Sequence, residues 1–302
     1  MGTSTPFDGP KNDRPLVPTF IDDTDSGIPD GNDDSADLQD GNGGDGTDKP
    51  VDGDDQGAGS TPQPAPPLPP PGPAGRFTAP RTNFTSFAQS GGTDRRSLGR
   101  AVSGYVRSSM GSPRRAAQRM GTARVSGANV VRLLQSVSAD GIAETLRRVN
   151  LSALAGRPIE EVFAGLADYV CPEDGSIDQG IDRNAFIETI ADLADAGITD
   201  IDGLTPEQMT TVFELYVAHT IEARICNDIG TKAVALPANP AAAQKVEDML
   251  HDFIQRGVTD AVARSGSNIQ ALSPADINGF VTSVYEDAFQ ILQVMGDAEA
   301  IR

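Results

Sequence analysis

Tryptophan is absent from this chain of 302 residues, and cysteine and histidine each occur only twice. The two cysteines, Cys171 and Cys226, are too few for a disulfide framework and lack the Cys-x-x-Cys pairs of a structural zinc site. No apolar run reaches the roughly 18 residues that a membrane-spanning helix needs. None near the start resembles a secretory signal. These absences predict a soluble, cytoplasmic protein with no membrane contact.

Catalytic motifs are missing as well. The chain has no Gly-x-x-x-x-Gly-Lys phosphate loop, no Gly-x-Ser-x-Gly elbow and no His-Glu-x-x-His helix. His219 is followed by Glu222 and Asp228, and a hydrolase built on these three is the weakest of the functional hypotheses. His251 is the other histidine, and so few ligands argue against a metal site. The sequence predicts a protein that is not an enzyme, with no metal and no bound cofactor.

Charge divides the chain into three parts. Residues 1–75 hold 15 Asp, no Glu and 3 basic residues, so their net charge is 3 − 15 = −12. Residues 76–150 hold 13 Arg, no Lys and 3 acidic residues, a net of 13 − 3 = +10. Residues 151–302 hold 8 basic and 25 acidic residues, a net of 8 − 25 = −17. Nucleic-acid binding needs a basic surface, which only the middle part offers.

The first 75 residues are expected not to form a packed core. Residues 1–60 are dominated by Asp, Gly, Thr, Ser and Asn, and too little apolar surface is present to offset the entropy of ordering them. We therefore expect a disordered acidic tail. Residues 61–75 include TPQPAPPLPPPGP, which favours polyproline II and predicts a semi-rigid linker, with a proline-motif docking site as the alternative.

In residues 76–125, arginines interleave with aromatic residues. This composition suits contact with nucleic acid, but its positive charge also suits docking on the acidic domain that follows or on a partner. We expect the segment to be partly ordered by such docking, and nucleic acid is the alternative. The candidate contact residues for a partner or for nucleic acid are Arg95, Arg96, Arg114, Arg115 and Arg119.

From residue 126 to residue 302 the apolar residues follow the period of amphipathic helices. Breaks are expected at Asp140-Gly141 and at Cys171-Pro172. Three long helices are expected to begin at a capping residue followed by proline, and to end at a glycine. The starts are Thr205-Pro206, Asn239-Pro240 and Ser273-Pro274, and the ends are Gly230, Gly266 and Gly296. With no convincing strand, the sequence predicts an all-α domain of about seven or eight helices.

One polar cluster is expected near the end of the helix that starts at Thr205-Pro206, in the run IEARICNDIGTK. It consists of Arg224, Asn227, Asp228 and Lys232. Two interpretations stay open, a polar binding surface and a structural network that closes the helix end.

The amino-terminal amine is chemically distinctive. Met1 precedes the small residue Gly2, so an aminopeptidase is expected to remove Met1. An α-amine titrates near ~7.7 to 8.0 and is therefore partly neutral and nucleophilic at cellular pH. A long tail would let this amine reach the active site of another enzyme.

Several runs carry a family resemblance. They are residues 151–209, which begin LSALAGRPIEEVFAGLADYV, then FELYVAHTIEARICNDIGTKAVALP and LHDFIQRGV. Over roughly residues 100–265 the chain resembles the QatB family of the four-component Qat anti-phage defence system, and the opening MGTS is similar as well. The resemblance implies three partners: an ATPase (QatA), a QueC-like enzyme (QatC) and a TatD-like nuclease (QatD).

QueC-type enzymes activate the carboxylate of a 7-deazaguanine with ATP and transfer it to an amine. The resemblance therefore implies Gly2 as the acceptor of a covalent 7-deazaguanine, with Thr3 and Ser4 as residues that QatC recognises. The helical domain would be a docking platform. The alternative function is a nucleic-acid sensor or adaptor that uses the arginine segment.

Overall fold

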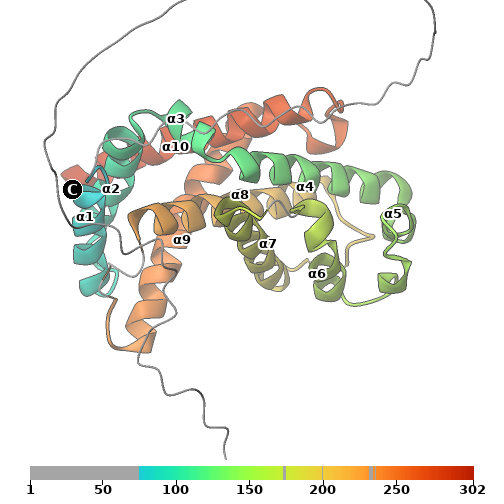
Figure 1. Cartoon of the computed structure of the whole chain (residues 1–302), viewed down its shortest axis with the longest axis horizontal. Coiled ribbons are helices and arrows are strands. Elements are labelled where there is room, and N and C mark those ends of the chain that lie inside the picture. Colours follow the sequence, from blue (N-terminus) through green and yellow to red (C-terminus); the bar gives the residue numbers. More distant parts are fainter. Residues whose placement is uncertain (1–74, 173–174, 199, 231–233, 235) are drawn as a thin grey trace, which may run out of the picture. The chain divides into compact units, whose positions relative to one another are not determined.

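The computed structural model describes residues 75–172, 175–198, 200–230, 234 and 236–302, and every regular element in those ranges is helical (Figure 1). The all-α prediction is confirmed for this part of the chain. Its α-helices are α1 (Thr78–Gln89), α2 (Arg95–Gly104), α3 (Pro113–Arg119), α4 (Gly121–Asp140), α5 (Ile142–Arg148), α6 (Ile159–Val170), α7 (Ile177–Asp195), α8 (Pro206–Ile229), α9 (Pro240–Ser265) and α10 (Ile277–Ile301).

The prediction of seven or eight helices concerned residues 126–302, which hold seven of the ten helices in the described residues, α4 to α10. The other three come from the arginine segment, which is itself helical. It contributes α1, α2, the π-helix η2 (Tyr105–Met110) and α3. The acidic tail 1–60, and residues 61–74 of the proline-rich linker, lie outside the described residues.

Aromatic burial explains why the arginine segment folds. Phe87 and Tyr105 are fully buried and Phe84 is almost so. Burying one such side chain contributes about 1.5–3 kcal/mol. Six arginines of the segment are exposed, as expected for the outer faces of amphipathic helices: Arg95, Arg96, Arg100, Arg107, Arg114 and Arg115. Arg76, Arg81, Arg119 and Arg124 are half-buried. Through its buried face α2 packs along α10 and α1.

Local capping signals set most boundaries as predicted. The Thr205 side chain accepts a hydrogen bond from the Gln208 backbone N–H at 3.2 Å, and the Gln208 side chain accepts one from the Thr205 N–H at 2.9 Å. This reciprocal pair begins α8. Asn239 caps α9, and Gly141, with a φ of 79°, separates α4 from α5. Gly230 and Gly266 follow α8 and α9 as predicted.

Both predicted limits of the last helix are wrong. α10 begins at Ile277 rather than at Ser273-Pro274, because the Ser273 hydroxyl bonds the Asp276 carboxylate at 2.5 Å within a turn. At the other end, α10 continues through Gly296 to Ile301. Gly296 faces α2 and contacts it, and it does not terminate the helix.

The three helices that carry the candidate site are neighbours in space. α8 packs against both α7 and α9 (Figure 1). Its apolar residues are buried over much of its length, including Phe213, Tyr216 and Ile221. Polar residues of α8 that lie toward α7 and α9 are therefore partly shielded from solvent.

Candidate functional site

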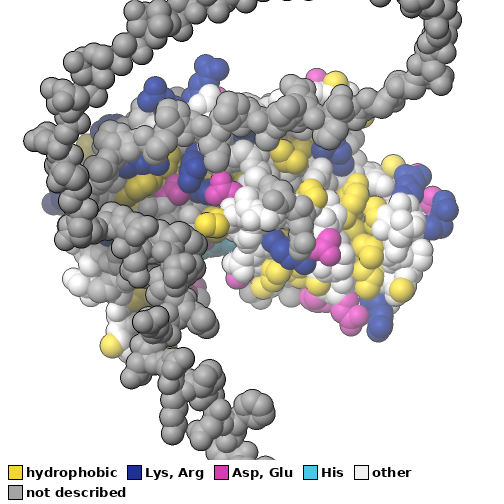
Figure 2. Space-filling model, in the orientation of Figure 1, with side chains coloured by type: hydrophobic (Ala, Val, Ile, Leu, Met, Phe, Trp, Pro, Cys, Tyr) yellow, Lys and Arg dark blue, Asp and Glu magenta, His cyan; other side chains and the backbone are white. Residues whose placement is uncertain are grey.

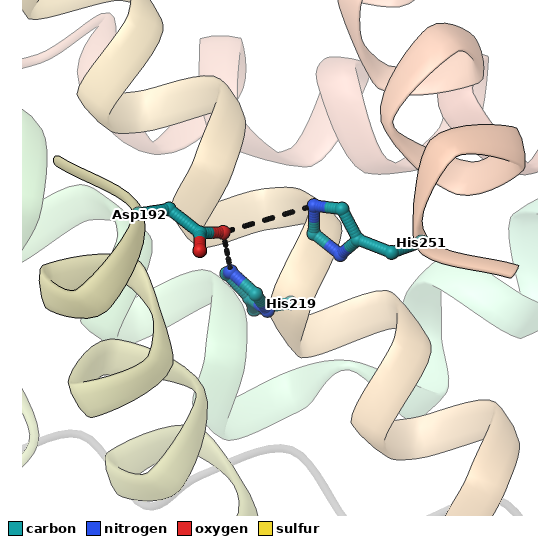
Figure 3. A group of neighbouring side chains, drawn as sticks. All are labelled: Asp192, His219 and His251. Carbon is teal, nitrogen blue, oxygen red and sulfur yellow. Dashed lines mark hydrogen bonds and ion pairs between the residues drawn. The ribbon is translucent and has the colours of Figure 1, made fainter. Parts of the chain in front are cut away.

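Two histidines and an aspartate converge where α7, α8 and α9 meet (Figure 3). Asp192 comes from α7, His219 from α8 and His251 from α9. His219 Nε2 lies 2.7 Å from Asp192 Oδ2, and His251 Nε2 lies 3.9 Å from the same oxygen. The three ligand-type atoms are all within 4.8 Å of one another.

A second carboxylate completes the group. Glu222 Oε2 lies 2.8 Å from His251 Nδ1. The two imidazole rings lie in contact, tilted by 34° to one another, with their centroids 4.5 Å apart. We call Asp192, His219, Glu222 and His251 the His–carboxylate cluster.

Burial and neighbouring charges shift the pKa values of the two histidines in opposite directions. The His219 side chain is 13% exposed and that of His251 is 18% exposed. Burial, followed by the charge of His251, lowers the pKa of His219 below its ordinary value despite the hydrogen bond with Asp192. The hydrogen bond with Glu222 raises the pKa of His251, against the opposing effect of burial. His219 is therefore harder to protonate than His251.

Sequence reasoning found only part of this cluster. His219 and Glu222 stand out along the chain because residues three apart share a helix face. Asp192 and His251 belong to other helices and fit no local spacing. The premise of too few ligands for a metal site is therefore wrong, because tertiary packing supplies the missing carboxylate and the second imidazole.

The hydrolase hypothesis is not supported by the geometry. Glu222 bonds His251, while His219 bonds Asp192. Asp228 accepts a hydrogen bond from the Tyr105 hydroxyl at 2.9 Å and lies 3.6 Å from Arg119. Asp228 is thus bonded outside the His–carboxylate cluster, to which His219 and Glu222 belong.

The predicted polar surface at the end of α8 is wrong for two of its members. Arg224 is fully buried, and its Nη1 donates to Asp178 Oδ1 at 2.6 Å. The Asp228 side chain is only 5% exposed. Asn227 is exposed, and Lys232 lies outside the described residues. For Arg224 and Asp228, the alternative of a structural network describes the contacts.

Most of the predicted arginine contacts lie on the surface. Arg95, Arg96, Arg114 and Arg115 are exposed, whereas Arg119 is half-buried beside Asp228. Figure 2 shows basic side chains around α3, and others near α5. A surface cavity of about 320 Å³ is lined by Arg95 together with residues of α9 and α10, including Asp252, Arg256 and Glu299.

The residues predicted for the modification and for its recognition, Gly2, Thr3 and Ser4, lie outside the described residues.

Comparison with known proteins gives one match. The model of the family described as Qat anti-phage system associated protein QatB matches residues 111–292, which is more than half of the chain. The chain belongs to the QatB family. It is therefore a component of the Qat anti-phage defence system, and this membership implies other Qat components as partners. No curated protein and no solved structure matches.

The QatB match begins just before α3, ends within α10 and includes the whole His–carboxylate cluster. It confirms the resemblance, and it extends further toward the carboxyl terminus than residue 265, where the resemblance stopped. Among the described residues, no helix of this QatB-family chain combines the length and apolar character needed to cross a membrane.

Proposed function

We propose that this QatB-family protein is a non-enzymatic component of the Qat system whose Gly2 amine accepts a 7-deazaguanine from QatC, with the helical domain as docking platform. The observation that carries the proposal is the MGTS start in a member of this family. Gly2 has no side chain to hinder an attack by its amine. The residues Thr3 and Ser4 would be read by the modifying enzyme.

The chemistry balances as an acyl transfer. QatC would join the carboxylate of the 7-deazaguanine to the α-phosphate of ATP, releasing pyrophosphate and forming an acyl adenylate. The neutral Gly2 amine would attack the acyl carbon, AMP would leave, and the nitrogen would lose one proton. The product is an amide, so the chain gains the mass of the acid less one water. No oxidant or reductant is required.

Co-expression with QatC and the other Qat components, followed by intact-mass and peptide mass spectrometry, tests the proposal. We expect an adduct on the peptide that starts at Gly2, absent when QatC is made unable to bind ATP. Gly2→Pro should remove the adduct, and Ser26→Ala, farther along the chain, should retain it as the matched control. An unmodified Gly2 peptide beside active QatC would refute the proposal.

A second candidate is nucleic-acid binding through the exposed arginines of α2 and α3. Its support is the exposure of Arg95, Arg96, Arg114 and Arg115. Replacing these four with Ala should weaken a gel shift, and should reduce the slope of the salt dependence by about one for each arginine that neutralises a phosphate. Arg147→Ala with Arg148→Ala on α5 is the control, because it removes exposed arginines elsewhere on the domain.

A further inference from the structure

The two imidazoles of the His–carboxylate cluster direct their Nε2 atoms at one oxygen. That oxygen, Asp192 Oδ2, is 2.7 Å from the nitrogen of His219 and 3.9 Å from that of His251 (Figure 3). A tetrahedral zinc ion with bonds of about 2.0–2.1 Å keeps its ligand atoms roughly 3.3 Å apart. The observed separations bracket that value. At 2.7 Å from a carboxylate oxygen, which only accepts, Nε2 of His219 carries a proton in the metal-free chain, and a bound ion would take the place of that proton.

Glu222 orients one of the two ligands. A carboxylate only accepts hydrogen bonds, so the Nδ1 atom of His251, 2.8 Å from Glu222 Oε2, carries a proton. In neutral His251 the lone pair is then on Nε2, the atom that faces Asp192. A histidine that donates its other N–H to a carboxylate is the usual arrangement around a protein-bound metal.

The charges of the cluster also favour a bound cation. Asp192 and Glu222 together supply two negative charges beside two imidazoles. A divalent cation would neutralise that pair of carboxylates.

We propose that Asp192, His219 and His251 bind a zinc ion, with Glu222 as the positioning residue for His251. Three protein ligands leave a fourth position for water or for a ligand from a partner. The Asp192 side chain is 36% exposed, so that position is open to solvent. The site is independent of the proposed modification of Gly2.

Zinc would add a further link among three helices that already share packing and side-chain hydrogen bonds. Each ligand comes from a different one of α7, α8 and α9. An ion that binds only the folded state stabilises it by an amount that grows with its affinity and concentration. A rise in thermal stability with added zinc is therefore a direct consequence of the proposal.

The test uses the full chain, freed of metal with a chelator and dialysed. Zinc is added by calorimetric titration in excess Mg²⁺, which occupies the carboxylates of the acidic tail. We expect saturation at one zinc per chain and a higher unfolding temperature. Cobalt(II) in place of zinc should give visible d–d absorption bands of a four-coordinate site with nitrogen and oxygen ligands.

Variants assign the ligands. His219→Ala, His251→Ala and Asp192→Asn should each abolish the cobalt bands, and Glu222→Gln should weaken zinc binding roughly tenfold to a hundredfold. Asp252→Asn is the matched control, because it removes one exposed negative charge next to His251 but no ligand atom. Circular dichroism checks that each variant is helical. Glu222→Gln, which retains an acceptor for His251, is the variant least disruptive to folding.

Three results would overturn the proposal. The first is the absence of saturable zinc binding by the metal-free chain, which would leave the cluster as a proton-linked network. The second is equal binding by wild type and by folded His219→Ala. The third is loss of the cobalt bands in Cys226→Ser but not in His251→Ala, which would place the metal at the thiol.

Discussion

Gly99 of α2 and Gly296 of α10 meet backbone to backbone. A Cβ atom added to Gly99 would lie 2.5 Å from the carbonyl oxygen of Gly296, and one added to Gly296 would lie 2.6 Å from that of Gly99. No side chain fits in either place. This close approach lets α2, from the arginine segment, lie directly against the last helix.

Substituting Gly296 with Ala should therefore destabilise the domain. The added methyl must separate α2 from α10, and overpacking of this kind costs about 1–3 kcal/mol. Chemical denaturation measures the change in unfolding free energy. Gly279→Ala is the control on the same helix, because nothing lies within 4 Å of the place that its Cβ atom would take. Gly279→Ala should leave the unfolding free energy unchanged or raise it slightly. Equal losses of unfolding free energy in Gly296→Ala and Gly279→Ala would contradict the packing argument.

The buried Arg224 depends on Asp178. Burial lowers the pKa of Arg224, but Asp178, with smaller contributions from Asp228 and Asp182, outweighs burial and raises it. Asp178→Asn should destabilise the fold by about 2–3 kcal/mol, because it removes a charged hydrogen bond and leaves the guanidinium buried. Glu144→Gln, at an exposed pair with Arg147, should have a much smaller effect in the same denaturation experiment. Equal effects of the two substitutions would contradict a structural role for the buried pair.

The amino-terminal cap of α2 gives a pH dependence. The Asp94 side chain accepts a hydrogen bond from the Ser97 N–H at 3.0 Å, and the Ser97 hydrogen bonds lower the pKa of Asp94. Its contribution to stability is therefore full above the unfolded pKa of 3.8 and is lost as pH falls through the lower, folded pKa. Asp94→Ala should cost about 1 kcal/mol at neutral pH. The difference in unfolding free energy between wild type and Asp94→Ala, measured by chemical denaturation, should shrink below pH 3.8. A difference that stays constant with pH would exclude a contribution from the ionised Asp94 side chain.

In the metal-free protein the two histidines should gain their protons at different pH values. Glu222 raises the pKa of His251 above 6.5, whereas burial and the charge of His251 lower that of His219 below it. His251 should therefore gain its proton first as pH falls. Since its folded pKa is raised, its contribution to stability is full below 6.5 and is lost as pH rises through the folded value. Imidazole resonances in NMR spectra, assigned with the His219→Ala variant, show which histidine gains its proton first as pH falls. Protonation of His219 before His251 would contradict the prediction.

The helical class and most helix ends were predictable from sequence because their causes are local. A capping residue followed by proline begins α8 at Thr205-Pro206, and Gly141 supplies the positive φ that separates α4 from α5. Each signal acts within one turn of the chain.

Tertiary structure decided what local patterns leave open. Gly296 has the sequence features of a helix end, and only the approach of α2 makes it an interior contact. The charge of Arg224 favours a surface position, but the helix turns it toward Asp178 in the interior. Along the sequence His219 has only Glu222 near it, and Asp192 and His251 reach it from neighbouring helices.

The sequence by itself determined the all-α class of residues 126–302 and most of their helix ends, because these depend on neighbours along the chain. The His–carboxylate cluster exists only because packing brings distant residues within bonding distance.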